Sequence, residues 1–364
     1  MSVGDTLDDG AIPAGRKRLG NLVIAGGTAV LAGTFLWQAL FSAGYISSGF
    51  STWMPVAYAY VVWGIALGAG QVITRGEAGH RALFVLPAVL FTVAMVIFPT
   101  LFGLYIALTD WNLSSFQGRQ FNGLDNFWQM LGDPYYRGAL FNMFLYVLAV
   151  LVEYFIAFGL ALLLNAQIKA RKFFRVVFLL PLMLSPVAVS WMIGKSLMEY
   201  RFGPLATLMR HLGWENPAFF SNPITARISI MMLDAWTYIP FMMIMLLAGL
   251  QAMSREVQEA ARVDGATPWQ AFWQVTFPLM LPVSITTIIL RIIFKLKLAD
   301  IIITVTSGGP GGATDSVTSF IYREYRDRSN VGYGTMLAMV YLVLIIIFVT
   351  LLLKLSQRFV RNVN

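Results

Sequence analysis

Eight long apolar runs dominate this chain of 364 residues and leave only short polar segments between them. About 20 consecutive apolar residues in a helix are enough to cross the hydrocarbon core of a bilayer, where every backbone N–H and C=O group must bond within the protein. Hydrophobic residues make up 58% of the sequence and charged residues only 12%, which argues against a soluble globular chain. The sequence therefore predicts an all-α integral membrane protein with eight transmembrane helices, at about residues 22–41, 53–73, 83–108, 138–164, 176–197, 224–247, 283–305 and 334–353.

The net charge of +8 arises mainly from cations in the short segments between the apolar runs. Cytoplasmic loops of membrane proteins carry an excess of Lys and Arg. With both termini in the cytoplasm, the inner segments hold more than half of the 26 cations: Arg16, Lys17, Arg18, Arg75, Arg81, Lys169, Arg171, Lys172, Arg175, Arg255, Arg262, Lys354, Arg358 and Arg361. This pattern indicates membrane topology rather than a nucleic-acid-binding surface, so we expect no nucleic acid partner.

Several kinds of chemistry are excluded or disfavoured by residue content. The chain has no cysteine, which excludes disulfides, thiol catalysis and Cys-based zinc sites. His80 and His211 are too far apart in sequence to suggest a metal site. A membrane-embedded enzyme would need paired acids or a histidine cluster in a loop, whereas acids such as Asp110 and Asp125 stand among ordinary turn residues. We therefore expect no catalytic residue, metal or cofactor in this chain.

A polar island at residues 258–282 interrupts the apolar pattern. Residues 256–263 contain helix formers and no breaker, and Asp264-Gly265 is a turn signal because glycine adopts positive φ without steric cost. Thr267 and Pro268 then favour a new helix, with Thr267 as the N-cap and Pro268 in its first position. Pro278 and Pro282 are expected to end that second short helix. The island therefore predicts two short helices separated by a tight turn.

The first of these helices has the features of a docking surface. Glu259 stands beside Ala260 and Ala261, whose small side chains allow a partner's backbone to approach. A carboxylate in this position offers a charge-assisted hydrogen bond to an Arg or Lys of the partner. The alternative is an ordinary cytoplasmic loop between two membrane spans.

This island closely resembles the coupling loop of permease subunits of ABC importers. The residues that carry the resemblance are Glu259-Ala260-Ala261, Asp264-Gly265-Ala266, Phe272, Pro278 and Pro282. The resemblance implies that residues 251–282 dock into an ATPase. No Lys-Ser or Lys-Thr follows the glycine-rich residues 308–312, so the chain has no phosphate-binding loop there. We therefore expect ATP and Mg²⁺ to be bound by a separate ATPase chain.

The resemblance continues from about residue 82 onward and is to the carbohydrate-type branch of these permeases, which includes maltose, glycerol-phosphate and polyol importers. The matching stretches include Thr109-Asp110-Trp111, Phe121-Asn122-Gly123-Leu124-Asp125-Asn126-Phe127, Phe178-Leu179-Leu180-Pro181, Ala248-Gly249-Leu250-Gln251 and Ser307-Gly308-Gly309-Pro310-Gly311. The family has a six-span core, which implies a permease core at residues 81–364 preceded by a two-helix extension at residues 1–80. It also implies a bacterial inner-membrane location, a second related permease subunit and an extracytoplasmic solute-binding protein.

Four ionisable residues fall inside expected spans: Glu153, Asp234, Arg291 and Lys295. A charge at mid-bilayer costs about 2.5–3.5 kcal/mol on insertion scales, so it normally faces a partner or a water-filled path. Matching depths predict contacts between Arg291 and Glu153 and between Lys295 and Asp234. These residues either lock the helices together or line the solute path. Trp236 and Tyr238 lie near Asp234 in sequence and either stack on sugar rings or anchor the membrane interface.

The sequence is compatible with more than one class of solute. If the acids neutralise Arg291 and Lys295, a neutral sugar or polyol fits best, whereas unpaired cations, with Lys297 beside them, would favour a phosphorylated solute such as glycerol phosphate. An ion-coupled secondary transporter is a further alternative. Such a transporter is expected to show internal repeats with interrupted helices at matching positions, and no clear repeat is visible in the sequence.

Overall fold

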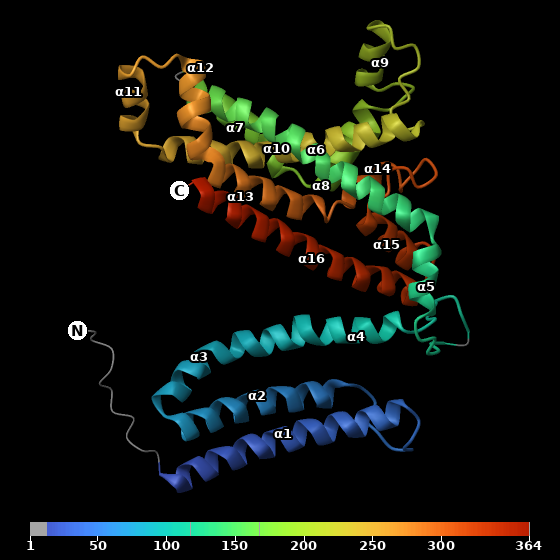
Figure 1. Ribbon diagram of the computed structural model, residues 1–364. Coiled ribbons are helices and arrows are strands. Elements are labelled where there is room, and N and C mark those ends of the chain that lie inside the picture. The colour runs from blue at the N-terminus through green and yellow to red at the C-terminus, as the bar shows by residue number, and fades with distance from the viewer. Residues whose placement is uncertain (1–12, 117, 167, 364) are drawn as a thin grey trace, which may run out of the picture. The chain divides into compact units, whose positions relative to one another are not determined.

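The computed structural model describes residues 13–116, 118–166 and 168–363, and these residues form helices joined by loops (Figure 1). Within these described ranges, seven helices or helix runs are long and apolar enough to cross a membrane, and one bent helix pair brings the possible number of spans to eight. The runs are α1 (Ala14–Ser42), α2 (Met54–Arg75), α3 to α4 (Glu77–Ala107), α6 (Pro134–Asn165), α10 (Pro223–Ala252), α12 to α13 (Pro268–Lys295) and α16 (Val331–Val363). The shorter helices outside these runs are α5 (Asp125–Gly132), α9 (Pro204–His211), α11 (Arg255–Val263), α14 (Asp300–Val305) and α15 (Val317–Arg326). The prediction of an all-α membrane protein is confirmed.

The fifth expected span is not a straight helix. It consists of α7 (Arg171–Met183), followed by α8 (Pro186–Val189) and a π-helical segment at Ser190–Leu197, and the two halves are bent by 97°. The proline ring at 186 disfavours helical backbone in the residue before it. Leu184 and Ser185 are accordingly extended, with ψ of 143° and 146°, and the Ser185 hydroxyl caps the new helix by accepting from the Ala188 N–H. The fifth expected span, at about residues 176–197, is therefore a bent pair of helices.

The seventh expected span begins earlier and ends earlier than residues 283–305. Helix α12 (Pro268–Ala271) continues through a π-helical turn (Phe272–Thr276) into α13 (Phe277–Lys295), and α14 is a separate helix. Pro278 and Pro282 therefore do not end the second coupling helix, contrary to expectation. A proline removes one backbone donor, and membrane helices tolerate this through neighbours and local π adjustments such as the one directly before Pro278.

The chain divides into two compact units, Met1–Phe102 and Gly103–Asn364. In the first unit α1 packs against α2 and α2 against α3. Gly27 faces the Trp63 and Ala66 turn of α2 with no room for a side chain, and the Tyr60 hydroxyl donates to the Leu90 carbonyl at 2.7 Å. The third span therefore groups with the first two by contacts. The domain boundary expected after residue 80 marks where the resemblance to the permease family begins, and it stays a prediction.

The second unit is built on α6, α10 and α13, which pack on one another, with α16 alongside α13 (Figure 1). Their facing sides form one apolar core from Val150 and Phe158 of α6, Leu246 of α10 and Met280 and Ile292 of α13. The Tyr154 hydroxyl, buried in this core, donates to Ser284 at 2.8 Å. This three-helix core positions the candidate functional site.

Candidate functional site

The four intramembrane charges meet in one buried cluster between α6, α10 and α13. Glu153 and Asp234 are 2% and 1% exposed, and Arg291 and Lys295 are fully buried. Arg291 Nε lies 2.7 Å from Glu153 Oε2, and Lys295 Nζ lies 2.7 Å from Glu153 Oε1. Asp234 Oδ2 accepts from both Arg291 Nη2 and Lys295 Nζ. The cluster has two acids and two bases, so its formal charges cancel.

Both contacts expected from matching depth are present, but the expected division into two separate pairs was wrong. Each cation contacts both acids, so the four groups form a closed ring of ion pairs. Arg291 and Lys295 are one helical turn apart on the same face of α13 and would repel each other without these acids. Depth in the membrane could predict which charges meet, but not how the helices that carry them are placed around one another in the plane of the membrane.

The two aromatic residues near Asp234 differ in their surroundings. The Arg291 guanidinium lies over the ring of Tyr238, with Cζ 4.5 Å from the ring centroid, which is a cation–π geometry. Tyr238 therefore helps to hold the cluster. The Trp236 side chain is 40% exposed. Its two expected roles, contact with a sugar ring and anchoring at the membrane interface, stay predictions.

A polar pocket of about 170 Å³ adjoins the cluster. Asp234 and Tyr238 form one of its walls, and the others come from the end of α13, the connection to α14, the start of α14 and the first residue of α8: Phe294, Lys297, Leu298, Ala299, Asp300, Ile301 and Pro186. Non-helical backbone at membrane depth is tolerated only where it is buried in protein or lines a water-filled cavity. The break at Leu184 and Ser185 leads directly into Pro186, a lining residue, so the bend and the pocket belong together.

The coupling loop has the turn that its sequence predicts. Helix α11 ends in a Schellman motif, in which the Ala266 N–H bonds to the Ala261 carbonyl and the Gly265 N–H to the Arg262 carbonyl, both at 3.0 Å. Gly265 has φ of +78°, as expected. The capping box of α12 follows, with Thr267 as N-cap and Gln270 bonding back to the Thr267 N–H at 2.9 Å.

The exposed face of this loop is larger than the sequence motif alone suggests. Glu259, Ala260, Asp264 and Gly265 are exposed, Ala266 is half-buried and Ala261 points inward and is buried. Large apolar side chains also lie open here: Val263 is 86% exposed and Trp269 is 71% exposed. Sequence reasoning missed these two residues, although a valine and a tryptophan in a polar island are a detectable signal. Trp269 is held by edge contact with Trp273, with centroids 5.6 Å apart.

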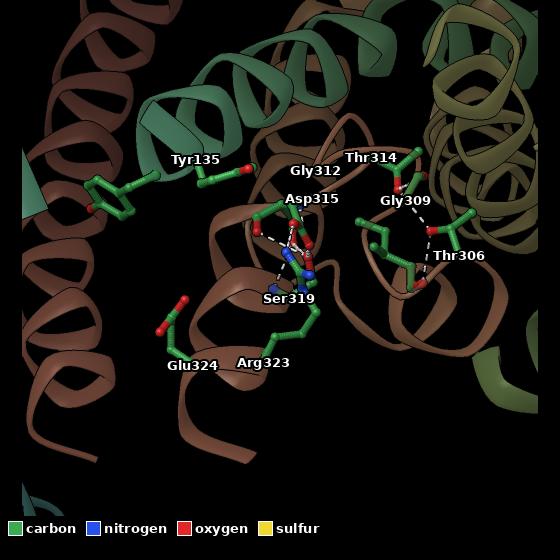
Figure 2. Close-up of polar contacts among 12 residues, drawn as sticks. Tyr135, Thr306, Gly309, Gly312, Thr314, Asp315, Ser319, Arg323 and Glu324 are labelled. Atoms are coloured by element: carbon green, nitrogen blue, oxygen red, sulfur yellow. Dashed lines mark hydrogen bonds and ion pairs between the residues drawn. The ribbon is translucent and has the colours of Figure 1, made fainter. Parts of the chain in front are cut away.

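The glycine-rich loop after α14 is tightly folded (Figure 2). Asp315 is buried in it, where it accepts from Ser319 at 3.0 Å and pairs with Arg323 of α15, and Thr314 donates to the Gly309 carbonyl at 2.8 Å. Burial raises the pKa of the Asp315 carboxyl above its ordinary value, although Arg323 acts in the opposite direction. A side chain at Gly308 would collide with this carboxylate. Gly308 therefore allows the close packing of the loop against Asp315.

Comparison with known proteins places most of the second unit in one family. Residues 154–362 match the family described as "Binding-protein-dependent transport system inner membrane component". The matched residues contain three members of the charge cluster and the whole coupling loop. Glu153 lies one residue before the match.

Individual relatives cover more of the chain. A trehalose/maltose transport system permease of Thermococcus litoralis is 31% identical over 283 residues, which are 77% of this chain and 95% of the relative. A sulfoquinovosyl glycerol transport system permease of Agrobacterium fabrum is 31% identical over 268 residues, 72% of this chain and 87% of the relative. Among solved structures, a bacterial ABC transporter involved in alginate import has a chain that matches with a TM-score of 0.66 at 21% identity, covering 77% of this chain and 95% of that chain.

We predict that neutrality of the cluster matters more than any one ion pair. Asp234→Asn leaves an excess positive charge and should destabilise the protein by about 3–5 kcal/mol. Adding Lys295→Met restores neutrality while the Glu153–Arg291 contact remains, so the double variant should recover part of the lost melting temperature in detergent. A double variant no more stable than Asp234→Asn would refute the charge argument. Exchanging only Glu153 and Arg291 should not rescue, because each new side chain would face a like charge across the ring.

We also predict that the Gly265 turn is limited by backbone conformation and not by space. No heavy atom lies within 4 Å of a Cβ built at Gly265, yet its φ is one that β-branched residues resist at a cost of about 1–3 kcal/mol. Gly265→Val should therefore speed hydrogen exchange of the α11 amides, while Gly265→Asn, which tolerates positive φ, should leave it nearly unchanged. Equal exchange in both variants would show that the turn carries no such constraint.

Proposed function

The chain belongs to the binding-protein-dependent transport system inner membrane component family and is a multi-pass permease of the sugar-importing ABC type. We propose that its own residues form a solute path beside the charge cluster. We also propose that its coupling loop receives force from a separate ATPase chain that binds ATP and Mg²⁺. In this proposal the chain is a transport subunit without a catalytic residue.

One observation carries the proposed path: a bent helix, a polar pocket and a neutralised charge cluster meet at the same place. Residues of the pocket outside the cluster include one cation, Lys297, and one acid, Asp300. With the cluster neutral and these two charges opposite, the lining favours a neutral polar solute over a strongly charged one. Tyr238 supplies an aromatic wall suited to a sugar ring. We therefore propose a neutral carbohydrate, a sugar or polyol, as the solute.

The proposed coupling rests on the exposed face of α11 and on the continuity of α12 with α13. Glu259 and Ala260 offer a carboxylate beside a small residue, and exposed Trp269 has the character of an interface hot spot. The run Pro268–Lys295 is 28 residues long, or about 42 Å at 1.5 Å per residue. Because Arg291 and Lys295 lie at its far end, a displacement of α12 by an ATPase would act on the charge cluster.

The proposed assembly contains two more partners, a second related permease chain and an extracytoplasmic solute-binding protein. Support for the latter comes from the family description and from a structure of a bacterial alginate ABC transporter in complex with a periplasmic protein carrying an alginate pentasaccharide. The distribution of cations supports a location of both termini in the cytoplasm.

An acidic or phosphorylated solute is the second candidate, because Lys297 is exposed at the pocket and lies outside the neutral cluster. The relatives named for sulfoquinovosyl glycerol and for alginate, an acidic polysaccharide, also point that way. Binding assays with the purified solute-binding protein distinguish the two candidates, since that protein selects the solute before it reaches the permease. High affinity for a phosphorylated sugar over its neutral counterpart would favour the second candidate.

We predict that Glu259→Lys abolishes solute-stimulated ATP hydrolysis in the reconstituted complex while leaving membrane insertion intact. The change reverses the charge of an exposed docking side chain without disturbing the buried side of α11. Glu77→Lys is the matched control, since it makes the same change at an exposed residue of an expected inner segment outside the loop. Normal coupled hydrolysis in Glu259→Lys, or equal loss in the control, would refute the docking role.

A further inference from the structure

Two arginines at the start of α7 converge on a single neutral oxygen atom. Arg171 and Arg175 are one helical turn apart and half-buried. With the Gln251 amide assigned so that its oxygen faces them, that oxygen accepts from Arg171 Nη2 at 2.7 Å and from Arg175 Nη2 at 3.1 Å. Gln251 lies at the end of α10, two residues before the coupling loop turns away. Three elements therefore meet here: α7, α10 and the first hinge of the loop.

The positive charge at this place is not balanced within the described part of the chain. No ion pair joins either arginine to a carboxylate among the described residues. Residues 166–178 contain no acid, and Lys169 and Lys172 add two further cations. Like charges one turn apart repel, and the helix N-terminus itself carries a positive partial charge. The Nε atoms of both arginines are also buried, and no described residue bonds to them.

The charge cluster in the membrane provides an internal comparison. Arg291 and Lys295 have the same spacing on α13 and are neutralised by Glu153 and Asp234. Within the described part of the chain, the pair on α7 has an amide oxygen as its acceptor, which carries no net charge. Two half-buried guanidinium groups that meet at one uncharged oxygen keep their positive charge, and this charge favours an anion with several acceptor oxygens beside them, such as a phosphate.

The surrounding side chains identify the source of that phosphate. Phe174 lies three residues after Arg171, on the neighbouring part of the same face of α7, and is 40% exposed. Cations next to exposed apolar side chains at the inner end of a membrane helix match the headgroup and acyl chain of a lipid. We propose that Arg171 and Arg175, oriented by Gln251, bind the phosphate of an anionic phospholipid in the cytoplasmic leaflet. This proposal uses the expected inner location of residues 166–171 and is independent of the solute.

The bound lipid would join the start of α7 to the end of α10, from which the coupling loop departs. The site would therefore stiffen the base of the loop when anionic lipid is present. A phosphodiester of a lipid and free phosphate share the same acceptor chemistry, so the test must separate them.

The test uses the full chain, purified in detergent and freed of native lipid, with binding measured by native mass spectrometry. Short-chain phosphatidylglycerol should bind, and short-chain phosphatidylcholine should bind much more weakly. Because the variant removes charge-assisted hydrogen bonds from two guanidinium groups to the phosphate, Arg171→Gln with Arg175→Gln should weaken phosphatidylglycerol binding at least about tenfold. The matched control is Lys354→Gln with Arg358→Gln, an exposed cation pair of the same spacing on α16. It should weaken binding less than about threefold, because exposed charges interact weakly through water.

A second variant keeps the proposal testable if the double variant folds poorly. Gln251→Glu places a carboxylate between the two arginines and neutralises one of their two positive charges internally. It should lower phosphatidylglycerol binding about tenfold or more while raising the melting temperature of the lipid-free protein.

Several results would overturn the proposal. One is an equal loss of lipid binding in the α7 and α16 variants, and another is unchanged lipid binding in Gln251→Glu. A third is displacement of the lipid by an equal concentration of inorganic phosphate, which would assign the arginine pair to a free anion. Normal lipid binding together with loss of an ATPase chain from the arginine variant would assign the pair to a carboxylate of that partner.

Discussion

Two cations buried among membrane helices require two acids, and this requirement governs how the central helices of the second unit pack. Arg291 and Lys295 enter from α13, Glu153 from α6 and Asp234 from α10, so the three helices must meet at one depth and in one rotation. A shift of any helix along its axis would separate charges that contact at about hydrogen-bond distance, in surroundings where an unpaired charge is costly. The polar pocket, the bend before α8 and the apolar core are all arranged around this contact.

Much of this arrangement was predictable because membrane insertion and turn chemistry are local properties. Apolar run length predicted the spans, Gly265 and Thr267 predicted the coupling turn, and depth predicted which charges would meet. The break at Leu184 and Ser185 was not predictable from hydropathy, since prolines occur in both continuous and broken membrane helices. Pro282 lies within an unbroken helix, whereas Pro186 begins a new one, and the difference depends on tertiary surroundings that no single sequence displays.

The candidate site shows the same limit. Residue type and spacing pointed to Glu259 and its neighbours, but not to the exposure of Trp269, because exposure depends on how α12 stands against the rest of the loop. The ring of four charges also required knowledge of three helices at once. Among the described residues of the second unit, acids neutralise the deepest cations, while Arg171 and Arg175 meet an amide. That difference separates charges that hold the fold from charges that remain available to an external anion.

We propose that this permease passes a neutral carbohydrate only when a partner ATPase acts on its coupling loop. The most direct test is uptake into vesicles reconstituted with the complete complex, using the solute that its binding protein carries. We expect uptake that requires ATP on the coupling-loop side, requires the solute-binding protein on the opposite side, and concerns an uncharged sugar or polyol. Uptake that persists without ATP and follows an ion gradient would contradict it.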